Sequence, residues 1–255
     1  NRAIHIKGKY VVNLSFDLEF ALNTRFWAGE KNKAVSLGIK ARKDMVRIEK
    51  MLKDKGVNHN VQIVGALLTD EPKNYLELSS EGKSIMAKYP ELFRLSNEER
   101  GILDNEFVDG GLHGFSHKSF YDISREEAEN EIKQAAQAFR AAYGRKAEFM
   151  SYPKNNVAHE EILVAHGIKF YRSHTMGGGR GKVPLGFWFS PNHFTVEDLR
   201  RLLMEIRSCR DGYFLHLWGH YTEMCAEQLL EYINVIKSEG WEFDSISRHT
   251  NHHGV

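Results

Sequence analysis

Apolar residues along this chain follow two alternating patterns, one typical of buried strands and one typical of helices. Short apolar or β-rich runs predict strands at residues 10–16, 61–68, 106–109, 147–150, 168–171, 213–218 and 242–246. Apolar residues three or four apart predict helices between them, at residues 35–55, 128–142, 158–166 and 225–239, with a further helix starting at Thr195. The polar stretch 69–105 is expected to hold short helices in a long excursion.

Local signals at the ends of these segments support the helix boundaries. Ser124 with Glu127 has the spacing of a capping box, in which each side chain accepts a hydrogen bond from the other residue's backbone. Glycine, which readily adopts the left-handed conformation that ends a helix, follows predicted helices at Gly56, Gly167 and Gly240. The boundaries therefore agree with the apolar pattern.

The alternation of strands and helices favours parallel βα units over separate α and β blocks. Six or seven units are predicted, and the first strand-to-helix turn lacks the glycine fingerprint of dinucleotide-binding folds. We predict an α/β fold, a single-domain deformed (β/α) barrel of about seven units over residues 1–255, with a loosely ordered tail from about residue 248. In such barrels the loops after the carboxyl ends of the strands carry the chemistry, so each polar cluster can be judged by its position.

Composition narrows the classes of partner. The 255 residues include 35 basic and 34 acidic ones, a net charge of +1, which gives no electrostatic reason to expect a nucleic acid or a membrane surface. No apolar run approaches the roughly 20 residues that span a bilayer. A neutral substrate suits this balance of charge.

Cysteine usage and the N-terminal segment bear on the compartment. Cys209 and Cys225 cannot build a disulfide framework, and we expect both to be buried thiols in a reducing compartment. The first nine residues contain no signal-peptide apolar region. We expect a cytoplasmic protein, with a secreted protein whose signal peptide has been removed as the alternative.

Two carboxylates, Asp17 and Glu19, directly follow the first predicted strand. Acidic side chains avoid buried strands unless they are paired or bind a metal, so Asp17 needs a partner. Taken alone, this carboxylate is as consistent with capping of local backbone groups as with a catalytic role.

Two histidines, His113 and His117, follow another short predicted strand. Imidazoles four residues apart meet on one side of a helical turn, where both can reach one metal ion at about 2.0–2.1 Å. Two histidines and one carboxylate leave coordination positions open for the water that hydrolysis needs. The spacing alone favours a pair of surface histidines in a loop, but the carboxylates at another strand end favour a metal site.

Two further polar segments follow predicted strands. His220 lies just past the strand 213–218, whereas His216 lies inside it and is expected to be a hydrogen-bonded core residue. The turn 151–156 either supplies backbone N–H groups or the Lys154 cation to a developing oxyanion, or is an ordinary solvated turn.

Other patterns carry no site. His159 and His166 are seven residues apart, not the four of a zinc-protease helix. The glycine-rich run 176–182 lacks the Gly-Lys-Ser/Thr ending of a phosphate loop and is expected to be a loop near the mouth of the site. Three histidines of the polar tail are expected to be bystanders, namely His249, His252 and His253.

In this order, these segments resemble the polysaccharide deacetylase (NodB-like) family over nearly the whole chain. Residues 109–117, Asp-Gly-Gly-Leu-His-Gly-Phe-Ser-His, are similar to the family's Glu-Ile-Gly-x-His-Thr/Gly-x-Ser-His. Residues 15–17 resemble the start of its Thr-Phe-Asp-Asp motif, and 149–153 stand where it has an Arg- and Pro-containing loop. Residues 217–220, Leu-Trp-Gly-His, resemble its late Leu-x-His segment. A subgroup with Phe-Asp-x-Glu and Trp-Gly-His segments is the most similar.

The resemblance implies a deformed (β/α) barrel that removes N-acetyl groups from sugars. It implies that His113 and His117 bind a divalent metal, usually zinc. It also implies that Asp17 is the base that activates the water and that His220 is the acid that protonates the departing amine.

The chain departs from the family's pattern at two positions. Leu18 replaces the second Asp of the family's pair, a metal ligand, and Glu19 is the natural substitute. The loop arginine that braces the base is missing, and Lys154 is expected to take its place. The resemblance further implies a backbone N–H near Tyr152 at the oxyanion, and His216 as the less favoured candidate for the acid.

The leading hypothesis is a metal-dependent N-deacetylase that acts on an N-acetylated sugar or polysaccharide, with a divalent metal, most often zinc, as cofactor. A hydrolase of another amide bond on the same barrel is one alternative, since a fold does not fix its substrate. A catalytically silent carbohydrate-binding relative is the other. The sequence carries no signal for the oligomeric state.

Overall fold

The computed structural model describes residues 8–22, 31–72, 76, 78, 80–172, 182–183 and 186–253. The strands are β1 (Tyr10–Leu18), β2 (His59–Ile63), β3 (Val108–Leu112), β4 (Phe149–Met150), β5 (Phe170–Arg172), β6 (Lys182–Val183), β7 (Phe187–Trp188), β8 (Tyr213–His220) and β9 (Glu242–Phe243). The helices are α1 (Lys31–Asp54), α2 (Ser80–Lys88), α3 (Asn97–Leu103), α4 (Arg125–Tyr143), α5 (Glu161–Ala165), α6 (Val196–Cys209), α7 (Ala226–Ser238) and α8 (Ile246–His253). Short 3₁₀ segments are η1 (Phe20–Leu22), η3 (Gly65–Leu68), η5 (Pro90–Phe93) and η6 (Pro153–Asn155).

The nine described strands form one sheet in which each pair is parallel. Their order is β6-β5-β4-β3-β2-β1-β8-β7, with β9 beside the amino end of β1. β6 and β7 are close in sequence but pair with β5 and β8, on opposite sides of the sheet. The four steps from Val183 to Phe187 reach at most about 14 Å, so the two sides must curl toward each other. The predicted deformed (β/α) barrel is confirmed.

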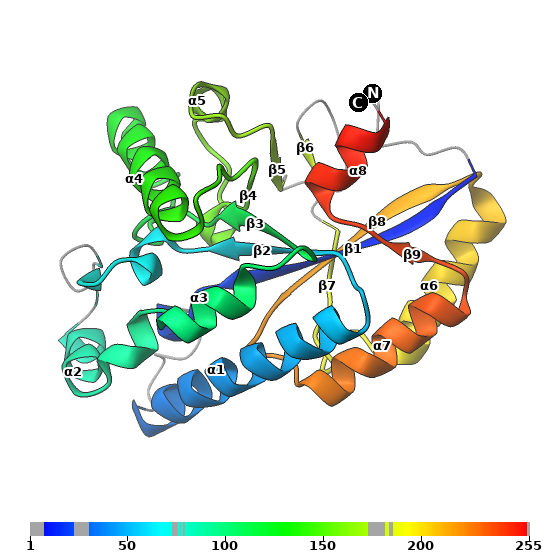
Figure 1. Ribbon diagram of the computed structural model, residues 1–255, viewed down its shortest axis with the longest axis horizontal. Coiled ribbons are helices and arrows are strands. Elements are labelled where there is room, and N and C mark those ends of the chain that lie inside the picture. The colour runs from blue at the N-terminus through cyan, green and yellow to red at the C-terminus, as the bar shows by residue number, and fades with distance from the viewer. Residues whose placement is uncertain are drawn as a thin grey trace.

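The face of β1 that meets the helices is apolar along its whole length. Val12, Leu14, Phe16 and Leu18 alternate along the strand and are buried in the main core. Figure 1 shows α1 and α7 side by side along this face, with α6 next to α7 and α4 near β3. Full burial of such a side chain stabilises the fold by about 1.5–3 kcal/mol, so the alternation of β1 fixes which face the helices cover.

The opposite face of β1 is polar and points into the barrel. Asn13 Nδ2 donates a hydrogen bond to Asn60 Oδ1 at 2.7 Å, and Ser15 Oγ donates to Gln62 Oε1 at 2.7 Å. The next residue on this face, at the carboxyl end of the strand, is Asp17. Neutral amide and hydroxyl pairs therefore occupy the middle of the barrel along β1, below the charged edge.

The helix α8 covers the amino end of the barrel (Figure 1). Ile246 packs with Val11 and Phe214 in a small apolar cluster. The backbone N–H of Ser247 donates to Asp109 Oδ2 at 3.0 Å, and His249 is buried. Residues 246–253 form a helix, and contacts with strands distant in the sequence hold its first turn.

The second predicted strand ends earlier than its apolar pattern suggests. The run 61–68 stops being a strand at Ile63, and Gly65–Leu68 form η3. A Cβ on residue 65 would lie 2.7 Å from Phe115 Cδ2 and 2.9 Å from Ala135 Cα. Glycine therefore lets this turn pack directly on α4. The excursion 69–105 holds the short helices α2 and α3 and the turn η5, as predicted.

The structure also bears on the cysteines and on membrane-spanning segments. Cys209 is exposed and Cys225 is half-buried, so the expectation of two buried thiols is wrong. Both lie at helix ends, Cys209 at the end of α6 and Cys225 just before α7, where the chain reaches the surface. Within the part of the chain that the structure describes, no helix is both long and apolar enough to cross a membrane.

Candidate active site

Polar side chains from four strands meet at the carboxyl end of the sheet. They belong to Asp17 and Glu19 at the end of β1, His113 and His117 after β3, Arg172 at the end of β5 and His220 at the end of β8. The register between β1 and β8 places Asp17 directly opposite His220. Because the strands are parallel, residues far apart in the sequence reach the same edge.

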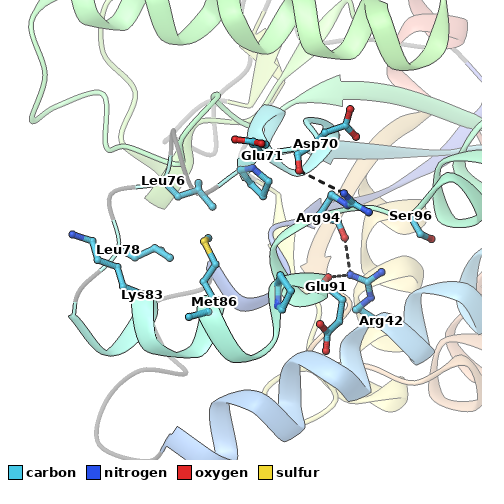
Figure 2. A pocket seen from close by; sticks show the side chains of 13 residues that line it. Arg42, Asp70, Glu71, Leu76, Leu78, Lys83, Met86, Glu91, Arg94 and Ser96 are labelled. Atoms are coloured by element: carbon cyan, nitrogen blue, oxygen red, sulfur yellow. Dashed lines mark hydrogen bonds between the residues drawn. The ribbon is translucent and has the colours of Figure 1, made fainter.

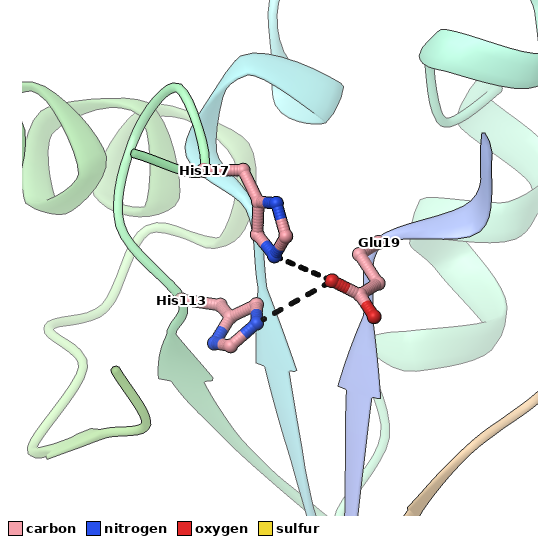
Figure 3. Close-up of side chains that lie close together, drawn as sticks. All are labelled: Glu19, His113 and His117. Atoms are coloured by element: carbon pink, nitrogen blue, oxygen red, sulfur yellow. Dashed lines mark ion pairs between the residues drawn. The ribbon is translucent and has the colours of Figure 1, made fainter. Parts of the chain in front are cut away.

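Glu19, His113 and His117 form the most compact group at this edge (Figure 3). One potential ligand atom from each side chain lies within 4.8 Å of the other two. Glu19 Oε2 is 2.5 Å from His117 Nε2 and 3.7 Å from His113 Nε2. Figure 3 shows both imidazoles directing a ring nitrogen at the same carboxylate oxygen. We call these three residues the ligand group.

The alternation of β1 explains why Glu19 belongs to the ligand group and Leu18 does not. Leu18 is fully buried in the core on the helix side of the strand. Residues two apart share a face, so Glu19 lies on the side of Asp17. Burial acts to raise the pKa of Glu19, but His117 and His220 hold that pKa well below its usual range. Glu19 is therefore ionised, as a metal ligand must be.

The run 113–117 is a tight bend, so the predicted helical turn is wrong. Gly114 and His117 have left-handed φ values of 66° and 63°, and the chain has no helix between β3 and α4. The bend brings the ring centroids of His113 and His117 to 5.1 Å. A Cβ on residue 114 would lie 3.1 Å from Pro153 Cγ, so glycine suits this position in both conformation and space. The histidines meet as predicted, by a different backbone route.

Ser151, the first residue after β4, connects the ligand group to Asp17. Its backbone carbonyl accepts a hydrogen bond from His113 Nδ1 at 2.9 Å, and its Oγ donates to Asp17 Oδ1 at 2.9 Å. Because a carbonyl oxygen only accepts, His113 Nδ1 carries the proton and Nε2 presents its lone pair to the ligand group. Histidines that bind metals usually donate their other N–H in this way. The sequence interpretation gave Ser151 no role.

Arg172 is the positive partner of Asp17. Its Nη1 donates to Asp17 Oδ1 at 3.1 Å, its Nη2 donates to Oδ2, and both side chains are buried. Burial acts to raise the pKa of Asp17, but the Arg172 guanidinium beside it lowers that pKa to about 2. The expectation that Lys154 braces Asp17 is therefore wrong. An arginine that ends an apolar strand needs a buried anionic partner, and this signal in the sequence points to Arg172.

His220 is held between two carboxylates. Its Nε2 is 3.0 Å from Glu19 Oε1, and its Nδ1 is 3.0 Å from Glu223 Oε2. Glu223 Oε2 also accepts a hydrogen bond from Trp188 Nε1 at 2.7 Å. Burial acts to lower the pKa of His220, but the charges of Glu19 and Glu223 raise it to about 10. This imidazole is therefore protonated at neutral pH and can donate a proton.

His216 lies inside the barrel and not at its edge. The β1–β8 register pairs His216 with Asn13, four residues before the level of His220. At about 3.3 Å per residue, this corresponds to roughly 13 Å along the strand. His216 is buried, which agrees with the expected core position.

Tyr152 and Lys154 occupy different positions relative to the edge. The Tyr152 ring is buried and makes edge contacts with Phe120 and Tyr171, so its side chain belongs to the core and only its backbone follows Ser151 along the edge. Lys154 is exposed and has a left-handed φ of 58°. It lines a cavity next to His117.

A polar cavity of about 380 Å³ opens beside the ligand group. His117, Lys118, Asp122 and Lys154 are among the residues that line it. Side chains of both charges and two serine hydroxyls give it hydrogen-bond donors and acceptors. A hydroxyl-rich molecule would suit such a lining better than an apolar one.

A larger cavity, of about 800 Å³, lies between α2, η5 and the segment after η3 (Figure 2). Its lining combines apolar side chains such as Leu76 and Met86 with charged ones such as Arg94, whose Nη1 donates to the carbonyl of Asp70 at 3.5 Å. None of the residues that line it belongs to the ligand group. Size therefore does not identify the site in this molecule, and the smaller polar cavity is the approach to His117.

The ligand group fits a divalent metal such as zinc. Two imidazole nitrogens and one carboxylate form a known catalytic zinc set that leaves a position open. Two atoms bound to one zinc ion are at most about 4.2 Å apart, and both distances from Glu19 Oε2 to the imidazoles are shorter. His117 Nε2 is buried and makes no hydrogen bond despite its closeness to Glu19. A nitrogen and a carboxylate that converge in this way suit a shared cation.

Comparison with protein families gives one match. The model of the polysaccharide deacetylase family matches residues 38–171, more than half of the chain. The matched range contains both histidines of the ligand group, while Asp17, Glu19 and His220 lie outside it. Comparison with curated protein sequences finds none that matches.

Several solved structures share the fold. A family 4 carbohydrate esterase from Bacillus anthracis has a TM-score of 0.57 and 13% identity, covering 97% of this chain and 85% of that one. A CE4 family pseudoenzyme from Bacillus anthracis has a TM-score of 0.55 and 14% identity. The match covers 95% of this chain but only 66% of the pseudoenzyme chain. A family 4 acetyl xylan esterase from Clostridium thermocellum, in complex with a cobalt ion, has a TM-score of 0.53 and 17% identity, covering 96% and 92%. At such identities the likeness shows the fold alone.

Proposed function

We propose that this chain, which belongs to the polysaccharide deacetylase family, is a metal-dependent hydrolase. In this proposal it removes N-acetyl groups from an N-acetylated sugar or polysaccharide. The observation that carries the proposal is the convergence of the ligand group beside a second carboxylate, Asp17, which has its own partners. Hydrolysis by an activated water needs both a metal ligand and a separate base. At this edge Glu19 can serve as the metal ligand and Asp17 as the separate base.

In this proposal Glu19, His113 and His117 hold the metal. A divalent cation, most often zinc for this donor set, supplies a Lewis acid that polarises the amide carbonyl and lowers the pKa of the attacking water. Ser151 fixes the orientation of His113 through the Nδ1 hydrogen bond. The ring cannot rotate without breaking that bond.

Asp17 takes the proton from the attacking water. Its Oδ1 already accepts hydrogen bonds from Arg172 and Ser151, whereas its Oδ2 accepts from Arg172. A carboxylate oxygen has two acceptor sites, so Oδ2 retains one that can receive the proton. Arg172 keeps the carboxylate ionised and fixes its plane, which prepares it for this role.

His220 donates the proton that the leaving amine requires. Its Nε2 gives its proton to the nitrogen of the breaking C–N bond, while Nδ1 keeps its proton and its hydrogen bond to Glu223. Trp188 holds Glu223 in place from the other side. Glu223 and Trp188 therefore act as positioning residues.

The substrate enters through the polar cavity beside His117. Its lining supports a sugar, whose hydroxyls need both donors and acceptors. In this proposal the backbone N–H of Tyr152 helps to stabilise the developing oxyanion. Lys154, which does not contact Asp17, serves the substrate from the cavity wall.

Metal content and acetate release together test the proposal. The purified protein should bind close to one equivalent of zinc or cobalt and should release acetate from an N-acetylated oligosaccharide. Stoichiometric metal without acetate release would favour a hydrolase of another amide bond. If the protein binds no zinc, cobalt or nickel, and His113→Ala changes nothing, the enzyme proposal fails.

Two observations favour a second candidate, a catalytically silent carbohydrate-binding relative. A pseudoenzyme shares the fold, and Leu18 stands where the family has a ligating carboxylate. Glu19 supplies a carboxylate from the adjacent position, which supports the first candidate. Sugar binding that is unaffected by metal removal, with no acetate release, would favour the silent relative.

A further inference from the structure

A buried carboxylate outside the ligand group contacts the bend between its two histidines. Glu131 lies on α4 and is 7% exposed. Its Oε2 accepts hydrogen bonds from the backbone N–H groups of Phe115 and Ser116, both at 2.8 Å. Its Oε1 accepts a third from Ser116 Oγ at 2.6 Å. Every one of these donors belongs to the residues between His113 and His117.

This carboxylate has no positive partner among the described residues, since no Lys, Arg or His there forms an ion pair with it. Burying a charge is unfavourable unless hydrogen bonds or an opposite charge compensate it. For Glu131 the compensation comes from three donors of one short bend. The bend and the carboxylate therefore satisfy each other.

The bend needs such support because its backbone is unusual. His117 has a φ of 63°, a left-handed conformation that residues other than glycine rarely adopt. Phe115 and Ser116 are both buried, so their N–H groups could not turn to solvent if Glu131 were absent. The hydrogen bonds of Glu131 hold the peptide between the histidines in the conformation that directs both rings to Glu19.

The helix that carries Glu131 is itself fixed relative to the bend. Gly65 of η3 packs so closely on α4 that a Cβ there would lie 2.9 Å from Ala135 Cα. The same turn donates two hydrogen bonds to the bend, from Gly65 N to Gly114 O at 3.0 Å and from Ala66 N to Phe115 O at 2.8 Å. The turn η3 thus contacts both α4 and the bend, and it sets the position from which Glu131 reaches the bend.

We propose that Glu131 is a positioning residue that preorganises His113 and His117, by holding the peptide between them with both carboxylate oxygens before the metal binds. The metal part of this inference rests on the proposed function. The conformational part concerns the bend alone. The three hydrogen bonds require acceptor atoms at the positions of the Glu131 oxygens, and they do not require a negative charge there.

Two conservative variants separate position from charge. Glu131→Gln keeps the length of the side chain: its carbonyl oxygen can accept from both N–H groups, and its NH₂ can donate to Ser116 Oγ, a hydroxyl that can also accept. Glu131→Asp keeps the charge but draws the carboxylate back by one methylene. The exposed Glu126 lies on the same helix, and Glu126→Asp is the matched control.

Zinc affinity is measured by competition with a chelator, and amide hydrogen exchange is measured in the metal-free protein. We expect Glu131→Asp to weaken zinc binding by about 10–100-fold and Glu131→Gln by less than about threefold. The control should bind as the wild type does. The Phe115 and Ser116 amides should be protected in the metal-free wild type and in Glu131→Gln, and should exchange faster in Glu131→Asp.

Several outcomes would overturn the inference. Loss of affinity in Glu131→Gln but not in Glu131→Asp would show that charge matters and position does not. Unprotected Phe115 and Ser116 amides in the metal-free wild type would exclude preorganisation. If the wild type binds no zinc, the proposed function fails. The exchange of these amides still tests whether Glu131 holds the bend.

A milder variant keeps the test decisive if Glu131→Asp does not fold. Ser116→Ala removes only the contact to Oε1, and we expect zinc to bind about two- to tenfold more weakly, the effect of one lost hydrogen bond. Unchanged zinc affinity together with unchanged exchange of the Phe115 amide would contradict the role of the carboxylate.

Discussion

Two buried groups of glutamate and histidine among the described residues differ in how completely their members satisfy each other's hydrogen bonds. On the helix side of the sheet, Glu49 of α1 accepts hydrogen bonds from Tyr221 Oη at 2.6 Å and from His59 Nε2 at 3.0 Å. The other nitrogen of that imidazole, Nδ1, lies 2.9 Å from the carbonyl of Val57. Both carboxylate oxygens and both imidazole nitrogens have partners.

The group at the carboxyl edge is different. Glu19 faces three imidazoles at once, those of His113, His117 and His220. One of them is 3.7 Å away, and His117 Nε2 makes no hydrogen bond. Composition and burial are similar in the two groups. The Glu49 group is closed, because each of its polar atoms has a hydrogen-bond partner, whereas the Glu19 group is open and has atoms that can bind a cation. A buried glutamate–histidine group therefore indicates a metal site only when some of its nitrogen or oxygen atoms lack hydrogen-bond partners.

The largest expected effect breaks the open group. His113→Ala removes one of two imidazole ligands, so metal affinity should fall by more than the roughly 100-fold that loss of an outer-shell partner can cost. Acetate release should be lost with the metal. Metal content after dialysis and an acetate assay check this. His216→Gln is the control: His216 lies on β8 inside the barrel, away from the ligand group, so this variant should retain metal. Full metal content in His113→Ala would contradict the proposed site.

A second substitution separates the two carboxylates of the edge. Asp17→Asn should reduce acetate release by about 10²–10⁴-fold, the usual contribution of a general base, while the metal stays bound. The measurement is the rate of acetate release at matched metal content. Loss of metal in this variant would mean that the roles assigned to Asp17 and Glu19 are exchanged.

The third prediction breaks the closed group. Glu49→Leu leaves His59 and Tyr221 without their partner in the core, and the free energy of unfolding should fall by about 3–5 kcal/mol. Zinc binding per folded molecule should not change, because Glu49 lies on the other face of the sheet. Urea unfolding and metal titration measure the two effects. Reduced zinc affinity in a folded Glu49→Leu protein would show that the groups are coupled.

The smallest effect concerns the pH dependence of stability. Burial acts to lower the pKa of His59, but Glu49 raises it above its usual 6.5. A raised pKa in the folded state stabilises the protein fully below the unfolded value and less as the pH rises through the folded value. The free energy of unfolding should therefore decrease from about pH 6.5 upward.

Glu49→Gln isolates this contribution. The amide can bond both His59 and Tyr221 without a charge, so the fold should persist while the pH dependence from His59 disappears. Contributions from His220 are common to both proteins and cancel in the difference between their stability curves. A flat difference curve above pH 6.5 would contradict the pairing.

The predicted elements show where a local pattern was sufficient. Ser124 and Glu127 form the capping box that starts α4, with both reciprocal hydrogen bonds present. The strand predicted at residues 10–16 is observed as β1, and its residues after Tyr10 are buried on both faces, as expected of a strand inside the sheet. The strand 61–68 was predicted too long, because the bend at Gly65 depends on how closely α4 approaches, and that contact is distant in the sequence.

The sequence by itself determined the order of the main strands and helices, though not the short strands β6 and β7, and hence that one edge of the sheet holds Asp17, Glu19, His113, His117 and His220. Periodicity and local capping act over a few residues, so the sequence records them directly. Which partner each edge residue takes depends on distances between separate strands. Only the tertiary structure placed Arg172 on Asp17 in place of Lys154, joined His113 to Asp17 through Ser151, and brought Glu131 from α4 to the bend. Those contacts cross the sheet, and no spacing along one segment encodes them.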